Sequence, residues 1–324
     1  MRSGRKRGHV SGNIREHGGG LDAAAKRFGG DRADWIDLST GINPQPHPVP
    51  SLSPDSWTAL PDKRAQERLI EAARQFWNVP PDAALLAVPG ASAAIAQTPR
   101  LAPPGRVSIA QPTYNEHGAS FAAHGWTEVP EGEQAEAAVI VHPNNPDGRT
   151  FDASALAAPL MIVDESFCDV MPSASLMPHA TRPGLLILKS FGKFWGLAGL
   201  RLGFVVGDPA LIARLADMLG PWPVSGPALE TGTTALRDTA WAEATRHRLR
   251  SDAARLDQLA QQAGLQLAGG TDLFRLYETP DAARWQERLA RHQIWSRSFS
   301  YAPHWLRLGL PPADGWARLE QALA

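Results

Sequence analysis

Six short apolar runs between residues 83 and 208 constrain the fold more than any other feature of the sequence. Each run is too short for a helix and is unbroken rather than alternating, as expected of strands covered on both faces. Gly, Pro and Asn clusters and stretches capable of forming helices separate them. The runs are ALLAV, RVSIA, AAVIV, LMIVD, LLILK and GFVVG. They predict an α/β domain with a mainly parallel sheet, whose carboxyl-terminal strand ends should carry the functional site.

A smaller α+β domain is predicted after the segment PWPVSGP at 221–227, which interrupts the alternating pattern. Its expected elements are a long helix from about Thr231 to Ala263, a strand at 273–278, a helix ending near His292, a strand at 304–310 and a closing helix.

These patterns divide the chain into three parts. We expect an N-terminal segment, 1–50, to contribute to the small domain and to the entrance of the active site. Residues 51–220 should form the large domain and residues 221–324 the small one. The segment 51–63 is expected to be a loop, and residues 150–160 are short for a helix.

Composition excludes several classes of protein. The 324 residues carry a formal net charge of −1, so nothing draws the whole chain to nucleic acid or to an anionic membrane. No apolar stretch is long enough to span a bilayer. Cys168 is the single cysteine, which rules out an intramolecular disulfide and a cysteine-based zinc cluster, and we predict no metal site. The basic start, MRSGRKR, should be a solvated tail, and because no apolar segment follows it we expect a cytoplasmic protein.

The stretch SFGKFWGLAGLRLGF, which follows the run LLILK, carries the clearest chemical signal. After Lys193 come seven glycine or apolar residues and then Arg201. An ammonium group is poorly hydrated in such surroundings, which lowers its pKa and makes the amine a nucleophile.

This stretch resembles the lysine motif of the class I and II aminotransferase superfamily, whose members are pyridoxal-phosphate (PLP) enzymes of fold type I. The resemblance implies that Lys193 forms an imine with the cofactor, and that Ser190 and Arg201 bind its phosphate. The fold it implies is a large PLP-binding domain with a mainly parallel sheet and a smaller α+β domain.

Further segments stand in the order that the superfamily requires. Ala91 and Ser92 open a predicted helix, where backbone amides can meet a phosphate. Asp164 ends a buried strand and therefore needs a cationic partner, which the cofactor's ring nitrogen can be. The remaining residues take their roles from the resemblance: Tyr114 stacks on the ring, His117 supports the aspartate, Asn145 bonds the ring oxygen and Arg307 holds the substrate carboxylate.

The N-terminal sequence narrows the resemblance. EHGGG at 16–20 and WIDLSTGINP at 35–44, together with GPWPVSGPAL, are similar to the threonine-phosphate decarboxylases of cobalamin biosynthesis, relatives of the histidinol-phosphate aminotransferases. The resemblance implies that L-threonine O-3-phosphate is converted to (R)-1-amino-2-propanol O-2-phosphate. It also implies that His17 and Gly41 help to bind this phosphorylated amino acid, and that the enzyme is a homodimer.

Two positions depart from the superfamily pattern. Phe167 stands where aminotransferases usually have a tyrosine that donates to the ring oxygen, and Leu60 stands where many relatives have a tyrosine that reaches the partner's cofactor. An aminotransferase for histidinol phosphate or a similar amino-acid phosphate remains an alternative, because its cofactor site would be the same. A catalytically silent PLP-fold binding protein is the alternative from another class.

Overall fold

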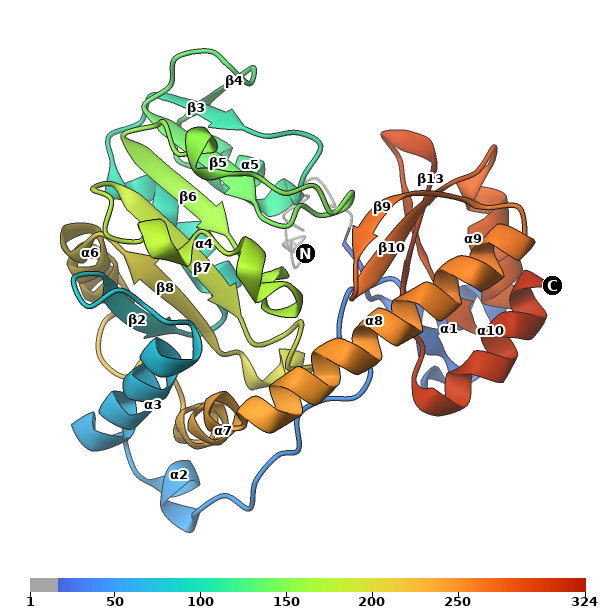
Figure 1. The fold of residues 1–324 in the computed structure, drawn as a ribbon, viewed down its shortest axis with the longest axis horizontal. Coiled ribbons are helices and arrows are strands. Elements are labelled where there is room, and N and C mark those ends of the chain that lie inside the picture. Colours follow the sequence, from blue (N-terminus) through green and yellow to red (C-terminus); the bar gives the residue numbers. More distant parts are fainter. Residues whose placement is uncertain (1–16) are drawn as a thin grey trace, which may run out of the picture.

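The computed structural model describes residues 17–324, and its central feature is a seven-stranded sheet (Figure 1). The strand order is β2-β8-β7-β6-β5-β3-β4, and only β8 runs opposite to the others. The strands are β2 (Ala84–Val88), β3 (Arg106–Ile109), β4 (Thr127–Val129), β5 (Ala137–Val141), β6 (Leu160–Asp164), β7 (Leu185–Ser190) and β8 (Gly203–Gly207). All six predicted strands are confirmed, and β4 is an additional short strand at the edge.

Helices cover both faces of this sheet, which explains why its strands are apolar on both sides. The helices on one face are α4 (Ala91–Gln97), α5 (Asn115–Ala123) and α6 (Pro209–Leu219), which share a core with alternate strand residues such as Ile162 and Leu188. Helix α3 (Lys63–Phe76) covers the other face, where Val163 and Ile187 belong to a second core cluster. Successive residues of β6 and β7 therefore face two different cores.

The rest of the chain forms a smaller α+β part. Its four-stranded antiparallel sheet has the order β12-β13-β10-β9, and β1 pairs in parallel with β11. The strands are β1 (Ile36–Asp37), β9 (Gln266–Thr271), β10 (Phe274–Glu278), β11 (Ile294–Trp295), β12 (Arg297–Phe299) and β13 (Ala302–Gly309). The helices are α1 (Leu21–Phe28), α9 (Ala282–Arg291) and α10 (Trp316–Leu323). The pairing of β1 with β11 joins residues 36–37 of the N-terminal segment to this smaller part.

The long helix predicted from Thr231 to Ala263 is in fact two helices, and this corrects the prediction. Helix α7 (Gly226–Arg237) packs against α3, and α8 (Thr239–Gln262) begins after Asp238. The Asp238 side chain accepts a hydrogen bond from Trp241 N and caps the new helix. Apolar periodicity continues across such a break, so the pattern alone does not reveal it. The domain boundary at residue 221 stays a prediction.

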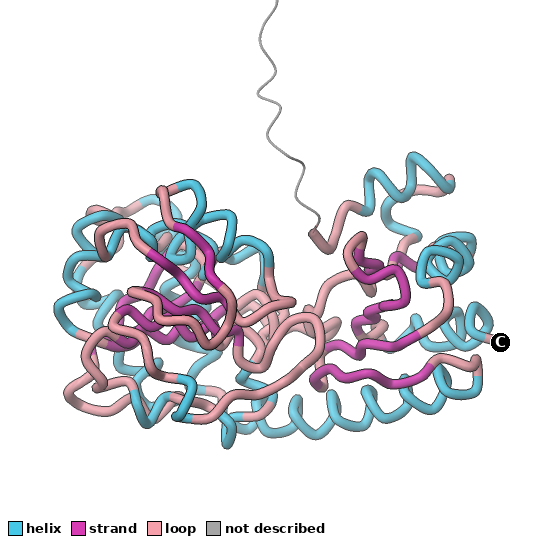
Figure 2. Tube along the Cα trace, turned by 90° about the horizontal axis from the view of Figure 1, so that it is seen from above, coloured by secondary structure: helices cyan, strands magenta, loops and turns pink. Residues whose placement is uncertain are grey.

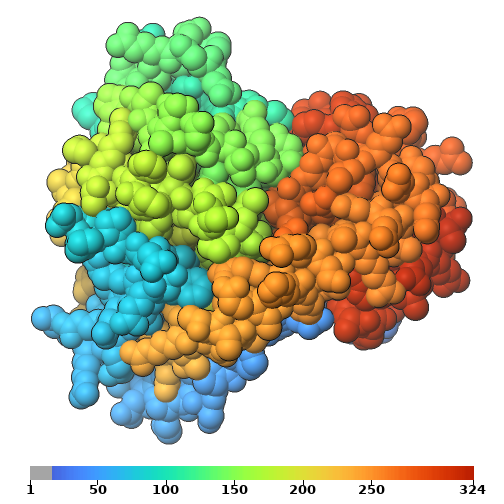
Figure 3. Space-filling view, in the orientation of Figure 1, coloured from blue at the N-terminus to red at the C-terminus, as the bar shows by residue number. Residues whose placement is uncertain are grey.

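Helix α8 runs from α7 toward the smaller sheet and connects the two parts (Figure 1). Seen from above, the two groups of strands lie on opposite sides of a zone of loops (Figure 2). The space-filling view shows the two parts in contact, with a notch between them at the upper edge (Figure 3).

The prediction that 51–63 is a loop needs correction, whereas residues 150–160 are short for a helix, as predicted. The segment 51–63 contains the short helix α2 (Pro54–Thr58), and residues 150–160 contain a short 3₁₀ turn, Ala153–Ala155, before β6 begins at Leu160. No helix among the described residues is long and apolar enough to cross a membrane. The basic start of the chain, MRSGRKR, lies outside the described residues.

Candidate active site

The segment that carries Lys193 leaves β7 and is fixed from the N-terminal side of the chain. Asn43 N donates to Lys193 O at 3.0 Å, and Asn43 Nδ2 donates to Phe194 O at 2.9 Å. One residue from the N-terminal segment therefore holds two successive backbone carbonyls, those of Lys193 and Phe194.

The Lys193 amine lies in an environment that disfavours its charge. Burial is the main cause, and the positive charge of Arg307 adds to it, while the carboxylates of Asp164 and Asp37 oppose it. Together these lower the pKa of Lys193 to about 8. Its Nζ atom lies 5.2 Å from the centre of the Phe167 ring, and it forms no ion pair with another described residue. Lys193 is partly buried, and its role in holding the cofactor stays a prediction.

Asp164 ends β6 and is 2 % exposed. Burial alone would raise its pKa, but hydrogen bonds from His117 and Ser166 outweigh burial and lower the pKa below its usual value. His117 Nε2 lies 2.9 Å from Asp164 Oδ2, and Ser166 donates to Oδ1 through both its N and its Oγ. The site therefore holds a buried, ionised carboxylate at the end of a central strand.

Arg307, on β13, reaches across from the smaller sheet to the large part of the chain. Its Nη1 donates to Asn145 Oδ1, and its Nη2 donates to Ser39 O at 2.6 Å. The side chain is 6 % exposed, its Nε is without a hydrogen-bond partner among the described residues, and no described carboxylate forms an ion pair with it. Burial, reinforced by the charge of Arg297, lowers the pKa of Arg307 to about 10.

Two cavities meet at Lys193. The inner one, of about 140 Å³, is lined by residues that the sequence assigned to the cofactor. They are Ala91, Ser92, Tyr114, Asn145, Asp164, Ser190, Lys193 and Arg201. A Cβ atom at Gly90 would lie 2.6 Å from Arg201 Nη2, so glycine leaves room for the guanidinium beside the start of α4. Two cations, an anion and the first amides of a helix fit pyridoxal phosphate, with its anionic phosphate and basic ring nitrogen.

The outer cavity, of about 180 Å³, shares Tyr114, Asn145, Phe167 and Lys193 with the inner one. Its other walls include His17, Arg297 and Arg307. His17 Nε2 lies 3.0 Å from Glu116 Oε1, and Arg297 Nη1 donates to His17 O at 2.9 Å. The outer cavity thus has two guanidinium groups in its wall, next to the amine.

Two predicted site residues line neither cavity. His117 lies behind Asp164, as its supporting role requires, with its ring 6.1 Å from that of Tyr114. Gly41 lies against Phe167, where a Cβ atom would come within 2.7 Å of the ring. Direct contact of Gly41 with a substrate stays a prediction, and the packing explains glycine there without it.

The sequence reasoning missed several residues of the site. Ser166 holds Asp164, Asn43 holds the Lys193 segment, and Arg297 lines the outer cavity. A serine two residues after a strand-end aspartate is a recognisable turn signal, as in the Asp37–Ser39 pair. Arg297 gives no such signal, because its place follows from the pairing of β12 with β13, where it lies opposite Arg307.

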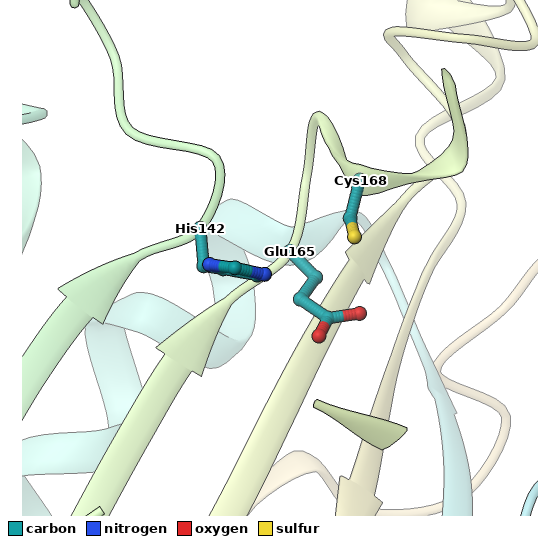
Figure 4. A group of neighbouring side chains, drawn as sticks. All are labelled: His142, Glu165 and Cys168. Carbon is teal, nitrogen blue, oxygen red and sulfur yellow. The ribbon is translucent and has the colours of Figure 1, made fainter. Parts of the chain in front are cut away.

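A further group of metal-ligand residue types lies near the strand ends and comprises His142, Glu165 and Cys168 (Figure 4). Its polar atoms already have partners. His142 Nε2 lies 2.7 Å from Ala174 O, its Nδ1 accepts from Phe151 N, and Glu165 Oε2 lies 2.6 Å from Lys189 Nζ. Burial raises the pKa of Cys168 and keeps the thiol protonated. The group therefore gives no support for a metal site.

The fold and the site define a class of protein, the pyridoxal-phosphate enzymes with an aminotransferase-like fold. The family model described as aminotransferase class I and II matches residues 126–323. A threonine-phosphate decarboxylase from Sinorhizobium is 43 % identical over 95 % of this chain and 97 % of the relative. One from Pseudomonas aeruginosa is 40 % identical over the same shares, 95 % and 97 %. The chain belongs to the class I and II aminotransferase family.

Solved structures agree on the fold. A histidinol-phosphate aminotransferase from Sinorhizobium meliloti, in complex with pyridoxal 5′-phosphate, has a TM-score of 0.80 at 18 % identity and covers 98 % of this chain and 97 % of its own. The L-threonine-O-3-phosphate decarboxylase of Porphyromonas gingivalis has a TM-score of 0.71 at 18 % identity, with 88 % and 97 % covered. These likenesses confirm the predicted fold class.

Proposed function

We propose that this protein is a PLP-dependent decarboxylase that converts L-threonine O-3-phosphate to (R)-1-amino-2-propanol O-2-phosphate and carbon dioxide, a step that the resemblance places in cobalamin biosynthesis. The names of the two relatives at 43 % and 40 % identity support it. The observation that carries it is the outer cavity, where Arg307 and Arg297 stand beside the Lys193 amine. A substrate with two anionic groups, a carboxylate and a phosphate, suits two guanidinium groups.

Each site residue has a part in this proposal. Ala91, Ser92, Ser190 and Arg201 hold the cofactor's phosphate, Asn145 donates to its ring oxygen, and Tyr114 lies against the ring. Asp164 keeps the ring nitrogen protonated, with His117 behind it. When bound, pyridoxal phosphate supplies a cationic ring that stabilises negative charge at the substrate's α-carbon. Lys193 holds the cofactor and moves protons with its amine.

The protein decides which bond at the α-carbon breaks by fixing the rotation of the substrate. The bond perpendicular to the ring plane is the one that the ring weakens. We propose that Arg307 holds the carboxylate, and that His17 and Arg297, which line the same cavity, hold the phosphate. Binding of the distal phosphate therefore contributes to the transition state, and unphosphorylated threonine should lose turnover as well as affinity.

A product assay tests the proposal. Protein loaded with PLP is incubated with threonine phosphate, with and without 2-oxoglutarate, and carbon dioxide, aminopropanol phosphate and keto acid are measured. We expect carbon dioxide and aminopropanol phosphate in equal amounts, independent of 2-oxoglutarate. Lys193→Ala is the control and should bind PLP without turnover. Keto acid that depends on 2-oxoglutarate would replace the proposal with transamination, and binding without any product would leave the silent binding protein.

We also propose that the protein is a homodimer. Large apolar side chains are exposed on and near α2, with Trp57 at 70 % and Leu60 at 68 %. Helix α2 lies at the edge of the molecule beneath α3 and α7 (Figure 1). Exposed aromatic and aliphatic side chains in one region are typical of a protein interface.

A further inference from the structure

A cluster of three buried charges lies behind the active site, on the other face of the central sheet. Lys189 precedes Ser190 on β7, and neighbouring residues of a strand point to opposite faces, so Ser190 lines the inner cavity and Lys189 does not. Lys189 Nζ lies 2.6 Å from Glu165 Oε2 and 3.4 Å from Asp169 Oδ1. None of the three residues lines either cavity at Lys193.

Every charge in this cluster has partners. Burial alone would lower the pKa of Lys189, but Glu165 and Asp169 raise it above its usual value. Glu165 accepts from Ser175 Oγ and Leu176 N. A buried ion group is weak evidence for added stability, because well-packed apolar residues often stabilise a core as well.

Asp169 connects this cluster to the segment that carries Lys193. Its Oδ2 accepts a hydrogen bond from Trp195 Nε1 at 3.2 Å, and its Oδ1 accepts one from Trp77 Nε1 at 2.9 Å. Trp195 stands two residues after Lys193 and is fully buried. A carboxylate with two indole donors and a lysine is a charge-assisted arrangement, stronger than neutral hydrogen bonds.

Aromatic side chains surround the fully buried Trp195 ring on its faces and at its edge. The ring lies between Phe191, at 5.0 Å and 10°, and Trp241, at 5.4 Å and 13°. Phe194, at 5.3 Å and 81°, and His47, at 6.0 Å and 67°, meet the ring edge-on. The hydrogen bond to Asp169 adds a directional restraint on the indole N–H that apolar packing does not supply.

Asp169 is also close in sequence to Phe167, whose ring lies near the Lys193 amine. Phe167 stands two positions before Asp169, and the Phe167 ring centre is 5.2 Å from Lys193 Nζ. The same carboxylate therefore joins the segment of Lys193 to the turn of Phe167. Asp169 thus positions the Lys193 segment and the Phe167 turn relative to each other without touching the Lys193 amine.

We propose that Asp169 is a positioning residue for Lys193: its carboxylate, held by Lys189, fixes Trp195 and so directs the Lys193 side chain over Phe167. The inference rests on the role given above to Lys193 in holding the cofactor, and not on the identity of the substrate.

The test is Asp169→Asn in protein loaded with PLP. Asparagine keeps the size but has one acceptor oxygen, so one indole N–H must face an amide donor. Two quantities are measured: the pH at which the absorbance of the lysine-bound cofactor changes, and kcat and KM for threonine phosphate. We expect that midpoint pH to move by about half a unit or more, and kcat to fall about tenfold or more with KM changed less than about threefold, because small misplacement of a reacting group is costly.

A matched control separates positioning from stability. Tyr277→Phe removes an aromatic donor from another, partly buried carboxylate, since Tyr277 Oη on β10 donates to Asp257 Oδ1 on α8 at 2.8 Å. It should lower the melting temperature without moving the absorbance midpoint or kcat. If Asp169→Asn behaves in the same way, Asp169 is only structural and the inference is wrong.

A second variant keeps the test decisive if Asp169→Asn does not fold. Trp195→Phe removes the donor of the same bond and leaves all three charges in place, and it must move both quantities in the same manner. An unchanged midpoint and kcat in Trp195→Phe would overturn the inference. If the parent binds PLP but makes no aminopropanol phosphate, the proposed reaction fails, while the absorbance comparison still tests Asp169.

Discussion

At the scale of single residues, the site places two ionisable groups in opposite situations. Burial and Arg307 push Lys193 toward its neutral form, the nucleophilic one. Hydrogen bonds from His117 and Ser166 keep Asp164 in its charged form despite burial. Environments that push two pKa values in the directions their roles need are typical of active sites.

The pKa of Lys193 predicts how fast cofactor-free protein captures PLP at different pH. An exposed lysine gains its neutral form near pH 10.5, but Lys193 does so near pH 8, so its reaction rate should rise with pH and level off above about 8. Arg307→Gln removes a nearby positive charge, raises the pKa and moves the midpoint to higher pH. Absorbance of the bound cofactor gives the rate. Arg288→Gln, on α9, is the control, and a parent midpoint near 10 would contradict the prediction.

Asp164→Asn should lower turnover far more than it lowers stability. The amide fills the same space but cannot hold a ring nitrogen protonated, so kcat should fall on the order of 10²-fold or more. Turnover with saturating PLP is compared with the melting temperature. Asp208→Asn is the matched control, because Asp208 caps α6 and asparagine caps as well. Normal turnover in Asp164→Asn would move the role to another carboxylate.

At the scale of elements, the site depends on where segments end. Asp164 ends β6, Lys193 follows β7, and Ala91 begins α4. The ends of two strands and the start of a helix therefore meet where the parallel strands end. The break between α7 and α8 sends one helix along α3 and the next toward the smaller sheet. That second helix contributes Trp241, which stacks on Trp195 in the Lys193 segment.

The cap at this break predicts a stability effect. Asp238→Ala should lower the free energy of unfolding by about 1 kcal/mol, within a range of about 0.5–2 kcal/mol, because Trp241 N loses its acceptor. Urea unfolding measures it. Asp238→Asn should restore most of the loss, since asparagine is an equally good cap. If the Asn variant is as unstable as the Ala variant, the cap is not the cause.

At the scale of the whole molecule, the outer cavity is built from both parts of the chain. Arg307 and Arg297 come from the smaller sheet, Lys193 and Asn145 from the large part, and His17 from the N-terminal segment. The relative placement of the two parts therefore sets the distance between the anion-binding groups and the amine. The proposed dimer belongs to the same scale.

The exposed apolar residues predict how the dimer can be separated. Trp57→Glu combined with Leu60→Glu places two charges in the proposed interface, so the protein should sediment as a monomer. Leu267→Glu is the control, because Leu267 is 50 % exposed on β9, away from α2. A parent that already sediments as a monomer, or a double variant that remains dimeric, would contradict the proposed interface.

Local pattern in the sequence was sufficient for the strands of the central sheet and for the residues at their ends. A short unbroken apolar run predicts a doubly covered strand, and residues at its end or shortly after it lie near the site, as for Asp164 and Asn145. The Lys193 segment is also local, because glycine and apolar neighbours alone predict a poorly hydrated amine.

Only the tertiary structure decided which distant residues meet. Arg307 bonds Asn145 across 162 positions, and Asn43 holds Phe194 across 151. Arg297 lies opposite Arg307 through strand register, and Asp169 reaches Trp195 on the face of the sheet away from the cofactor cavity. Such contacts depend on strand pairing, on the helix break at Asp238 and on the packing of the two parts. Hydrophobic periodicity determines what each segment becomes, whereas the free energy of the whole packed molecule determines which segments lie side by side.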